Sequence, residues 1–293
     1  MPEPIDLGWG ARSHVDVDGV RIAVETAGGA GRPVLALLHG FASGTFSWAG
    51  VAPTWADRHR VVAWDRPPFG HSDRPAPPPR GALDPYGVDA VVATARAVLD
   101  EHAGDGPLVL VGHSAGTLVA TQLVLAGGFD VRGAVLIAPA LAGEPPGLLR
   151  RLFALPGASA VGAAALKLGV RGARVALRRV GQHGTPLIEA TGAETARSLR
   201  RPGTAEALVH LTTTWERPAL LDDLGPLGVP TSVIGGIDDR ISTPTATRDV
   251  ADRLAAELHL LERVGHAPHE QVPGLVASLV SEFVESVVEE GGR

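Results

Sequence analysis

Short apolar runs recur along this chain, and each of them ends in a turn. Uninterrupted apolar runs of this length are typical of strands that are buried on both faces of a parallel sheet. Segments with helical spacing lie between them, for example Tyr86 to His102 and Ala115 to Ala126. Strands and helices that alternate in this way predict an α/β fold with a mostly parallel sheet. The clearest runs are PVLALLHG, HRVVAWDRP, PLVLVGHS, RGAVLIAPA and VPTSVIGG.

Further strands complete the predicted sheet. Asp18 and Gly19 separate two segments of alternating polarity, which predicts a β-hairpin, and ELHLLERV predicts the last strand. Helices are expected from Pro244 to Ala256 and from Gln271 to Val288. We therefore expect a doubly wound, eight-stranded sheet.

The strand rhythm stops after Ala140 and returns only with VPTSVIGG. Residues 142–215 are predicted to form a helical insertion, so that residues 1–141 and 216–293 make up the core. Between Glu144 and Glu206 there are ten basic and four acidic side chains, in a chain whose net charge is −6. This surplus is consistent with a solvated helical face, or with a surface that attracts an anionic substrate or carrier.

Composition excludes several classes of function. The chain has no cysteine, which excludes disulfides, thiolate metal sites and a cysteine nucleophile. Its net negative charge gives no sign of a nucleic-acid partner. The first residues, MPEPIDLGWGARSH, lack the apolar core of a signal peptide, so a cytoplasmic protein is expected. The nearly uncharged segment from Leu152 to Val170 predicts a helix that is buried or part of the helical insertion. Contact of this helix with a membrane surface is the alternative, and it is not expected to span the membrane stably.

The triplet GHS occurs twice, and only one copy has the setting of a nucleophile. Gly112, Ser114 and Gly116 form G-x-S-x-G between an apolar strand and an Ala-rich helix, which predicts a sharp turn that presents the serine. Ser72 has Arg74 where the second glycine would stand and lies among prolines, which predicts a rigid structural loop.

A serine hydroxyl needs a base, and the base needs a carboxylate that orients it. His266 follows the last strand, where a side chain can reach across the carboxyl edge of a parallel sheet; His269, near the final helix, is the rival. Asp238 and Asp239 follow the strand VPTSVIGG, and one of them is expected to face the histidine.

Two backbone amides are expected to stabilise a developing oxyanion. The N–H of Ala115 lies at the start of the helix after Ser114, and the N–H of Phe41 lies in the loop after PVLALLHG.

Taken together, the motifs LLHGF, DRPPFGHSDRP, VGHSAG, GGIDDRISTP and VGHAPHE resemble the α/β-hydrolase superfamily, in its capped, esterase-like branch. They occur in the family's order of serine, acid and histidine, from about Pro33 to Pro273. The family's acid motif is similar to Gly236, Asp239, Arg240 and Pro244, which implies Asp239 as the acid. The resemblance also implies that residues 142–215 form a cap, or lid, and that the site needs no cofactor and no metal.

Departures from the family narrow the expected reaction. Dehalogenases and epoxide hydrolases of the family carry an aspartate at the position of Ser114. Carbon–carbon bond hydrolases usually have Asn and Trp where this chain has His113 and Ala267. The expected function is therefore a serine hydrolase that cleaves an ester, thioester or lactone through an acyl-enzyme.

Other reactions use the same residues. A carbon–carbon bond hydrolase, a cofactor-free haloperoxidase or perhydrolase, a cyclase of natural-product synthesis, and a non-catalytic ligand-binding protein remain alternatives. Aromatic side chains predict a medium-sized, largely apolar small-molecule substrate. The candidates to contact it are Phe41, Phe46, Trp48, Phe69 and Trp215.

Overall fold

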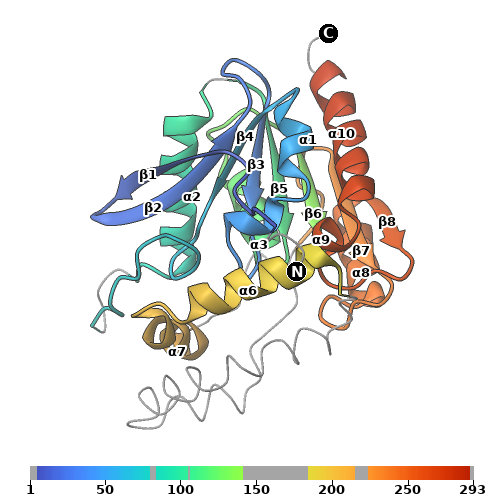
Figure 1. The fold of residues 1–293 in the computed structure, drawn as a ribbon. Coiled ribbons are helices and arrows are strands. Elements are labelled where there is room, and N and C mark those ends of the chain that lie inside the picture. The colour runs from blue at the N-terminus through green and yellow to red at the C-terminus, as the bar shows by residue number, and fades with distance from the viewer. Residues whose placement is uncertain (1–4, 80–83, 105, 141–183, 215–223, 291–293) are drawn as a thin grey trace.

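The computed structural model describes residues 5–79, 84–104, 106–140, 184–214 and 224–290 of the chain. Its centre is one eight-stranded sheet with the strand order β1-β2-β4-β3-β5-β6-β7-β8 (Figure 1). The strands are β1 (Ala11–Val17), β2 (Val20–Ala27), β3 (Val34–Leu38), β4 (Arg60–Trp64), β5 (Leu108–His113), β6 (Val131–Ile137), β7 (Thr231–Gly236) and β8 (Glu257–Leu261). This confirms the predicted mostly parallel sheet.

Only β2 runs against the other strands. β2 pairs antiparallel with β1 and β4, and every later neighbour in the sheet pairs in parallel. Asp18 and Gly19 both have positive φ, at 53° and 79°. Two such residues make the tight turn that suits the twist of a hairpin, and the predicted hairpin is confirmed.

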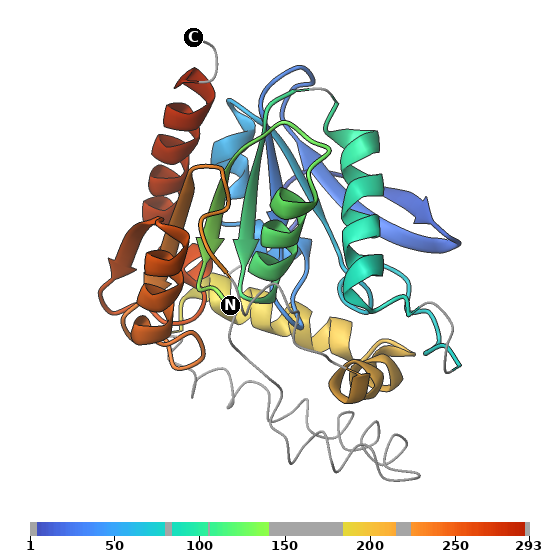
Figure 2. The ribbon, with the colours of Figure 1, turned by 180° about the vertical axis from the view of Figure 1, so that it is seen from behind.

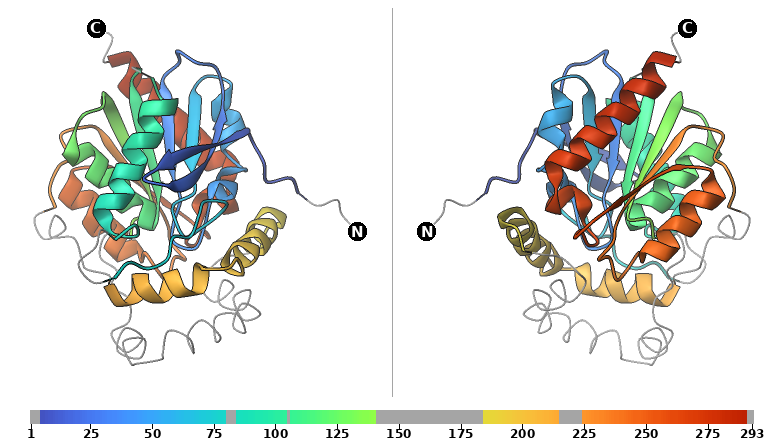
Figure 3. Two further views of the ribbon diagram at one scale, coloured as in Figure 1. Left: turned by 90° about the vertical axis from the view of Figure 1, so that its left-hand side faces the viewer. Right: turned by 90° about the vertical axis from the view of Figure 1, so that its right-hand side faces the viewer.

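Helices cover both faces of the sheet. α2 (Val88–His102), α3 (Ala115–Ala126) and α8 (Pro244–Leu254) lie on one face, seen in front in Figure 2. The short helices η1 (Thr45–Trp48) and α1 (Ala52–Ala56) lie on the other face with α10 (Pro273–Glu290). The helices α6 (Pro186–Leu199) and α7 (Thr204–Thr214) lie together at one end of the sheet, as both side views in Figure 3 show.

The alternation of side chains along the central strands divides the core into two. Val34, Ala36 and Leu38 of β3 pack in the cluster that includes α2, α3 and α8. Leu35 and Leu37 of the same strand pack in the cluster that includes Trp55 and α10. Because successive residues of a strand point to opposite faces, one apolar run supplies both cores.

The last predicted helix, from Gln271 to Val288, is present as α10, and a single turn, α9 (Pro268–Gln271), precedes it. Val272 between them is not helical, with φ −133° and ψ 58°. It precedes Pro273, and the ring of a proline disfavours helical geometry in the residue before it. This break places the residues of α9 beside the end of β5.

Part of the predicted insertion is described. Two helices, α6 and α7, lie within residues 142–215, and α6 crosses the carboxyl ends of the central strands (Figure 1). Both predicted domain boundaries, at 141/142 and 215/216, lie outside the described residues. The segment from Leu152 to Val170 also lies outside them. Among the helices that the structure describes, none has the length and apolar character needed to cross a membrane.

Candidate active site

A sharp turn between β5 and α3 presents Ser114. Its φ of 50° and ψ of −119° lie where few residues other than glycine are found, a conformation that costs about 1–3 kcal/mol and is common at functional sites. The two flanking glycines make the turn possible. A Cβ on Gly112 would lie 2.8 Å from the Gly116 carbonyl oxygen, and a Cβ on Gly116 would lie 2.0 Å from the Leu38 carbonyl oxygen.

The structure brings Ser114, His266 and Asp239 into one hydrogen-bonded chain. The Nε2 atom of His266 is 2.9 Å from Ser114 Oγ, and Nδ1 is 2.8 Å from Asp239 Oδ2. Because an ionised carboxylate only accepts hydrogen bonds, the ring carries its proton on Nδ1. The lone pair of Nε2 then faces the serine hydroxyl, which is the arrangement that general-base removal of its proton requires.

Local backbone amides hold the Asp239 carboxylate in place. Oδ1 accepts hydrogen bonds from the N–H groups of Ile241 at 2.7 Å and Ser242 at 3.0 Å. The Ser242 hydroxyl in turn donates to the Ala138 carbonyl just beyond β6. These bonds orient the aspartate from a loop that begins at the end of β7. The contact with His266 is made by Asp239 and not by its neighbour Asp238.

His113 and His269, the two histidines beside His266, have structural roles. His113 donates from Nε2 to the His266 carbonyl at 2.8 Å, which fixes the backbone that carries His266. The His269 ring packs against Trp48 and His113, with centroids 4.6 Å and 4.5 Å away. Burial lowers the pKa of His269 to about 3 and holds that of His113 well below its ordinary value. Both rings are therefore neutral at physiological pH.

The two amides expected to bind an oxyanion lie close to Ser114 in the fold. Ala115 is the first residue of α3, and Phe41 lines the same cavity as Ser114. Within the described part of the chain, neither N–H donates a hydrogen bond. They are thus available to a ligand, as the first amides of a helix usually are.

His39 shapes the loop that carries Phe41. Its Nε2 accepts from the Arg66 N–H at 2.8 Å, so Nδ1 carries the proton and donates to the Gly40 carbonyl at 2.7 Å. Burial, with the nearby Arg66 charge, lowers the pKa of His39 to about 3. The neutral His39 ring therefore connects the loop that carries Phe41 to the backbone of Arg66, just after β4.

The second GHS triplet belongs to a structural loop. Ser72 is buried; its hydroxyl donates to the Asp65 carbonyl and accepts from the Ala23 N–H at 2.8 Å. The Asp65 carboxylate accepts from the N–H groups of Thr45 and His71, both at 2.7 Å. Burial raises the pKa of Asp65 to about 6. Ser72 fastens this loop to β2, and its hydroxyl donates to a backbone carbonyl and not to a side-chain base.

A cavity of about 300 Å³ opens on Ser114 and His266. Its wall combines the Phe41 loop, the end of β5, the loops that follow β7 and β8, α9, and one side of α6. Most lining side chains are apolar or small. The lining residues are Phe41, Ala42, Ser43, His113, Ser114, Ile188, Thr191, Gly192, Thr195, Ile241, His266, Ala267 and Glu270.

Of the aromatic residues expected from the sequence to contact substrate, Phe41 lines the cavity and three others do not. Phe41 is 57% exposed and lines the cavity. Phe46, Trp48 and Phe69 are buried and are not among the described residues of the cavity wall. Trp48 belongs to the core between η1 and α10, while Phe69 packs edge-on beneath Phe41 at 5.2 Å. Trp215 lies outside the described residues.

The cavity also contains residues that sequence reasoning missed. Ile188 and Thr191 come from α6, Ile241 follows Asp239, and Glu270 comes from α9. Pro268 and Pro273, five residues apart, are the one sequence signal of the short turn that places Glu270 there.

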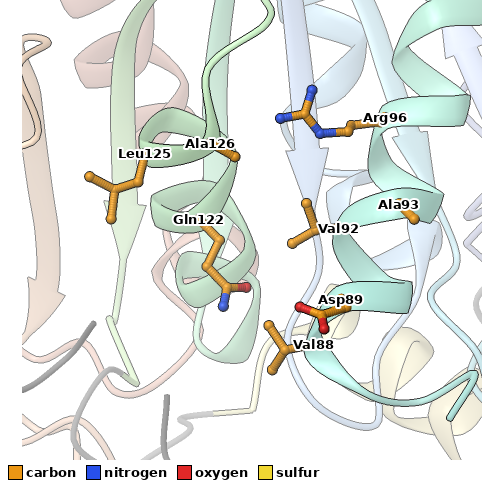
Figure 4. A pocket seen from close by; sticks show the side chains of 8 residues that line it. All are labelled: Val88, Asp89, Val92, Ala93, Arg96, Gln122, Leu125 and Ala126. Carbon is orange, nitrogen blue, oxygen red and sulfur yellow. The ribbon is translucent and has the colours of Figure 1, made fainter. Parts of the chain in front are cut away.

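A larger hollow of about 470 Å³ lies between α2 and α3 (Figure 4). It is lined by side chains such as Val92, Arg96 and Leu125, and is an open groove on the face of the helices. Neither Ser114 nor His266 lines it, so the smaller cavity is the one that can support chemistry. Within the described residues, no group of three or more His, Cys, Asp or Glu side chains is arranged to hold a metal ion.

The sequence model of the alpha/beta hydrolase family matches residues 35–279, which include every element from β3 to the first part of α10. The chain belongs to the alpha/beta hydrolase family. This match and the eight-stranded sheet agree with the resemblance inferred from the motifs.

Curated relatives match only part of this chain. Epoxide hydrolase A of Mycobacterium tuberculosis is 35% identical over 114 residues, which are 39% of this chain and 34% of that protein. The chain spans about a third of the length of the curated relatives it matches.

Solved structures match over nearly the whole chain. The crystal structure of ALR0039 from Nostoc sp. PCC 7120 has a TM-score of 0.77 at 21% identity, and the match covers 95% of this chain and 99% of that one. Est816, described as an N-acyl homoserine lactone degrading enzyme, has a TM-score of 0.67 at 25% identity and covers 92% of this chain and 100% of its own.

Proposed function

We propose that this alpha/beta hydrolase transfers the acyl group of a small ester, thioester or lactone to water. The observation that carries the proposal is the hydrogen-bonded chain from Ser114 Oγ through His266 to Asp239. A strained serine, a base with its lone pair toward that serine, and a carboxylate behind the base are the parts that nucleophilic acyl transfer requires.

The first half of the reaction forms an acyl-enzyme. His266 Nε2 takes the proton of Ser114 as Oγ attacks the carbonyl carbon. The N–H groups of Phe41 and Ala115 stabilise the oxyanion, a contribution worth about 10²–10³ in rate for one such donor. His266 then gives its proton to the departing alcohol, thiol or ring oxygen.

Water completes the cycle. His266 accepts a proton from water, and the resulting hydroxide adds to the acyl carbonyl. Collapse of this second intermediate returns the proton to Ser114 Oγ and releases the carboxylic acid. Asp239 stays ionised throughout, keeps the proton of the neutral ring on Nδ1, and stabilises the imidazolium.

The chemistry of the nucleophile argues against epoxide opening, in spite of the relatives named for it. A carboxylate that opens an epoxide forms an ester, which water can cleave at its carbonyl. A serine that opened an epoxide would form an ether, which has no carbonyl for water to attack. Ser114 therefore favours substrates that already contain an acyl carbon.

The cavity supports a modest substrate. About 300 Å³ is at the small end of ligand pockets, and Phe41, Ile188 and Ile241 give it a largely apolar wall. The description of Est816 adds lactones to the acyl substrates worth testing. The small-molecule substrate, the cytoplasmic location and the cap role of residues 142–215 stay predictions.

Hydrolysis of p-nitrophenyl esters of increasing acyl length tests the proposal. Wild-type protein is expected to prefer short or medium chains, because the cavity is small. The Ser114→Ala variant should lose about 10⁴-fold or more in kcat, whereas Ser278→Ala, on the exposed side of α10, should keep wild-type turnover. Equal turnover by wild type and Ser114→Ala would contradict the proposal.

A further inference from the structure

A second carboxyl group faces the cavity that contains Ser114, and the acyl-transfer mechanism does not use it. Glu270 lies on α9, four residues after His266. It lines the cavity together with Ser114 and His266, although the residue is only 9% exposed. A glutamate so deeply buried is rare unless a partner satisfies it.

Only one of its two carboxyl oxygens has a hydrogen-bond partner in the described residues. Oε2 accepts from the Thr191 hydroxyl of α6 at 2.7 Å. Oε1 lies 3.9 Å from His269 Nε2, too far for a hydrogen bond. No arginine or lysine of the described residues pairs with Glu270, and its side chain has no further hydrogen bond or ion pair there.

Among the described residues around Glu270, none is shown to supply a counter-charge. Burial raises its pKa to about 7, against the smaller effect of the Thr191 hydrogen bond. The rings of His269 on its own turn and of His113 on β5 are kept neutral by burial. The open side of this acceptor is the cavity, and a ligand that donates a hydrogen bond there would give Oε1 the partner that it lacks among the described residues.

We propose that Glu270 is a specificity-determining residue that accepts a hydrogen bond at Oε1 from a substrate group, so that the preferred ester, thioester or lactone carries a hydroxyl or another donor. The proposal depends on the proposed function only in that the substrate is taken to be an ester, thioester or lactone. The Thr191 hydrogen bond fixes the carboxyl from α6, so the acceptor is already oriented before substrate binds. Above the pKa of Glu270, substrates with a carboxylate at the same place are disfavoured, because the two ionised groups repel.

Matched pairs of esters test the proposal. In each pair one member ends in a hydroxymethyl group and the other in an ethyl group of similar size. Methyl p-(hydroxymethyl)benzoate and methyl p-ethylbenzoate vary the acyl part, and the acetates of p-(hydroxymethyl)phenol and p-ethylphenol vary the alcohol part. Binding is measured by calorimetry in the Ser114→Ala background, which leaves the esters intact, and turnover in the Ser114 protein.

The ratio of the two Kd values in a pair is the decisive quantity. We expect Glu270→Leu to reduce the preference for the hydroxymethyl member about tenfold in at least one pair. Glu270→Gln, which keeps an acceptor oxygen, should retain part of it. The control Glu189→Leu makes the same change on the exposed face of α6 and should leave the ratio unchanged.

Two results separate this proposal from the proposed function. Equal Kd ratios in the Glu270 protein, Glu270→Leu and Glu270→Gln for both pairs, with thermal melts showing folded protein, would overturn the role of Glu270 even if the esters are hydrolysed. A Glu270-dependent preference in binding without any turnover would support Glu270 and refute acyl transfer instead.

Discussion

The close packing of Gly116 against the end of β3 makes the nucleophile turn unusually sensitive to one methyl group. A Cβ at this position would lie 2.0 Å from the Leu38 carbonyl oxygen and 2.8 Å from the His39 carbonyl oxygen. Both are backbone atoms, one in the last residue of β3 and one in the residue after it, so they cannot rotate away as a side chain would. In Gly116→Ala the start of α3 must therefore move.

The required movement sets the size of the effect. Ordinary contact begins near 3.4 Å, so relief of the clash needs a displacement of about 1 Å or more. Overpacking of this kind costs about 1–3 kcal/mol. A displacement of this size would break the 2.9 Å hydrogen bond between Ser114 Oγ and His266 Nε2. A misplacement of reacting groups by about 1 Å lowers a rate about 10²-fold.

Thermal unfolding and p-nitrophenyl butyrate turnover measure the two effects. We expect Gly116→Ala to melt several degrees lower, at about 2–4 °C for each kcal/mol, and to lose about 10²-fold in kcat. Gly274→Ala in α10 is the matched control, since its Cβ would meet nothing within 4 Å, and should keep both Tm and kcat. Wild-type Tm and kcat in Gly116→Ala would refute the packing argument.

Three further predictions concern buried polar groups. Asp239→Asn should lower kcat about 10⁴-fold by favouring the wrong histidine tautomer, while Asp238→Asn should change kcat little; comparable losses in the two variants would reject the assignment. Ser72→Ala leaves the Ala23 N–H without its acceptor and should lower the free energy of unfolding by about 1–3 kcal/mol, measured in urea; unchanged stability would contradict its structural role. Because the folded-state pKa of Glu270 is raised from 4.5 to about 7, the stability from its protonated form is present below pH 4.5 and lost as pH rises through 7. Relative to Glu270→Gln, wild type should therefore lose up to about 3 kcal/mol across this range, and parallel pH–stability curves would contradict the raised pKa.

Local patterns were enough to predict the sheet and the serine. The apolar runs that became β3 and β5 alternate between two cores, and this alternation depends only on strand geometry. The glycines around Ser114 are likewise a local requirement, because each would clash with backbone if it carried a side chain.

The rest of the site depends on distant contacts. Asp238 and Asp239 could not be separated by residue type alone, and only the loop after β7 decides which one faces His266. Trp48 looked like a substrate contact because aromatic residues often line pockets, but it fills the core under His269. Glu270 was missed because its place depends on the break at Val272 and on Thr191, which is far away in sequence.

Covalent capture of the acyl group tests the central claim most directly. The protein is incubated with p-nitrophenyl butyrate, quenched in acid and mapped by peptide mass spectrometry, with a fluorophosphonate as a second probe. The account predicts one butyryl adduct on the peptide that contains Ser114 and no adduct in Ser114→Ala. An adduct at Ser72, or steady ester turnover by Ser114→Ala, would contradict it.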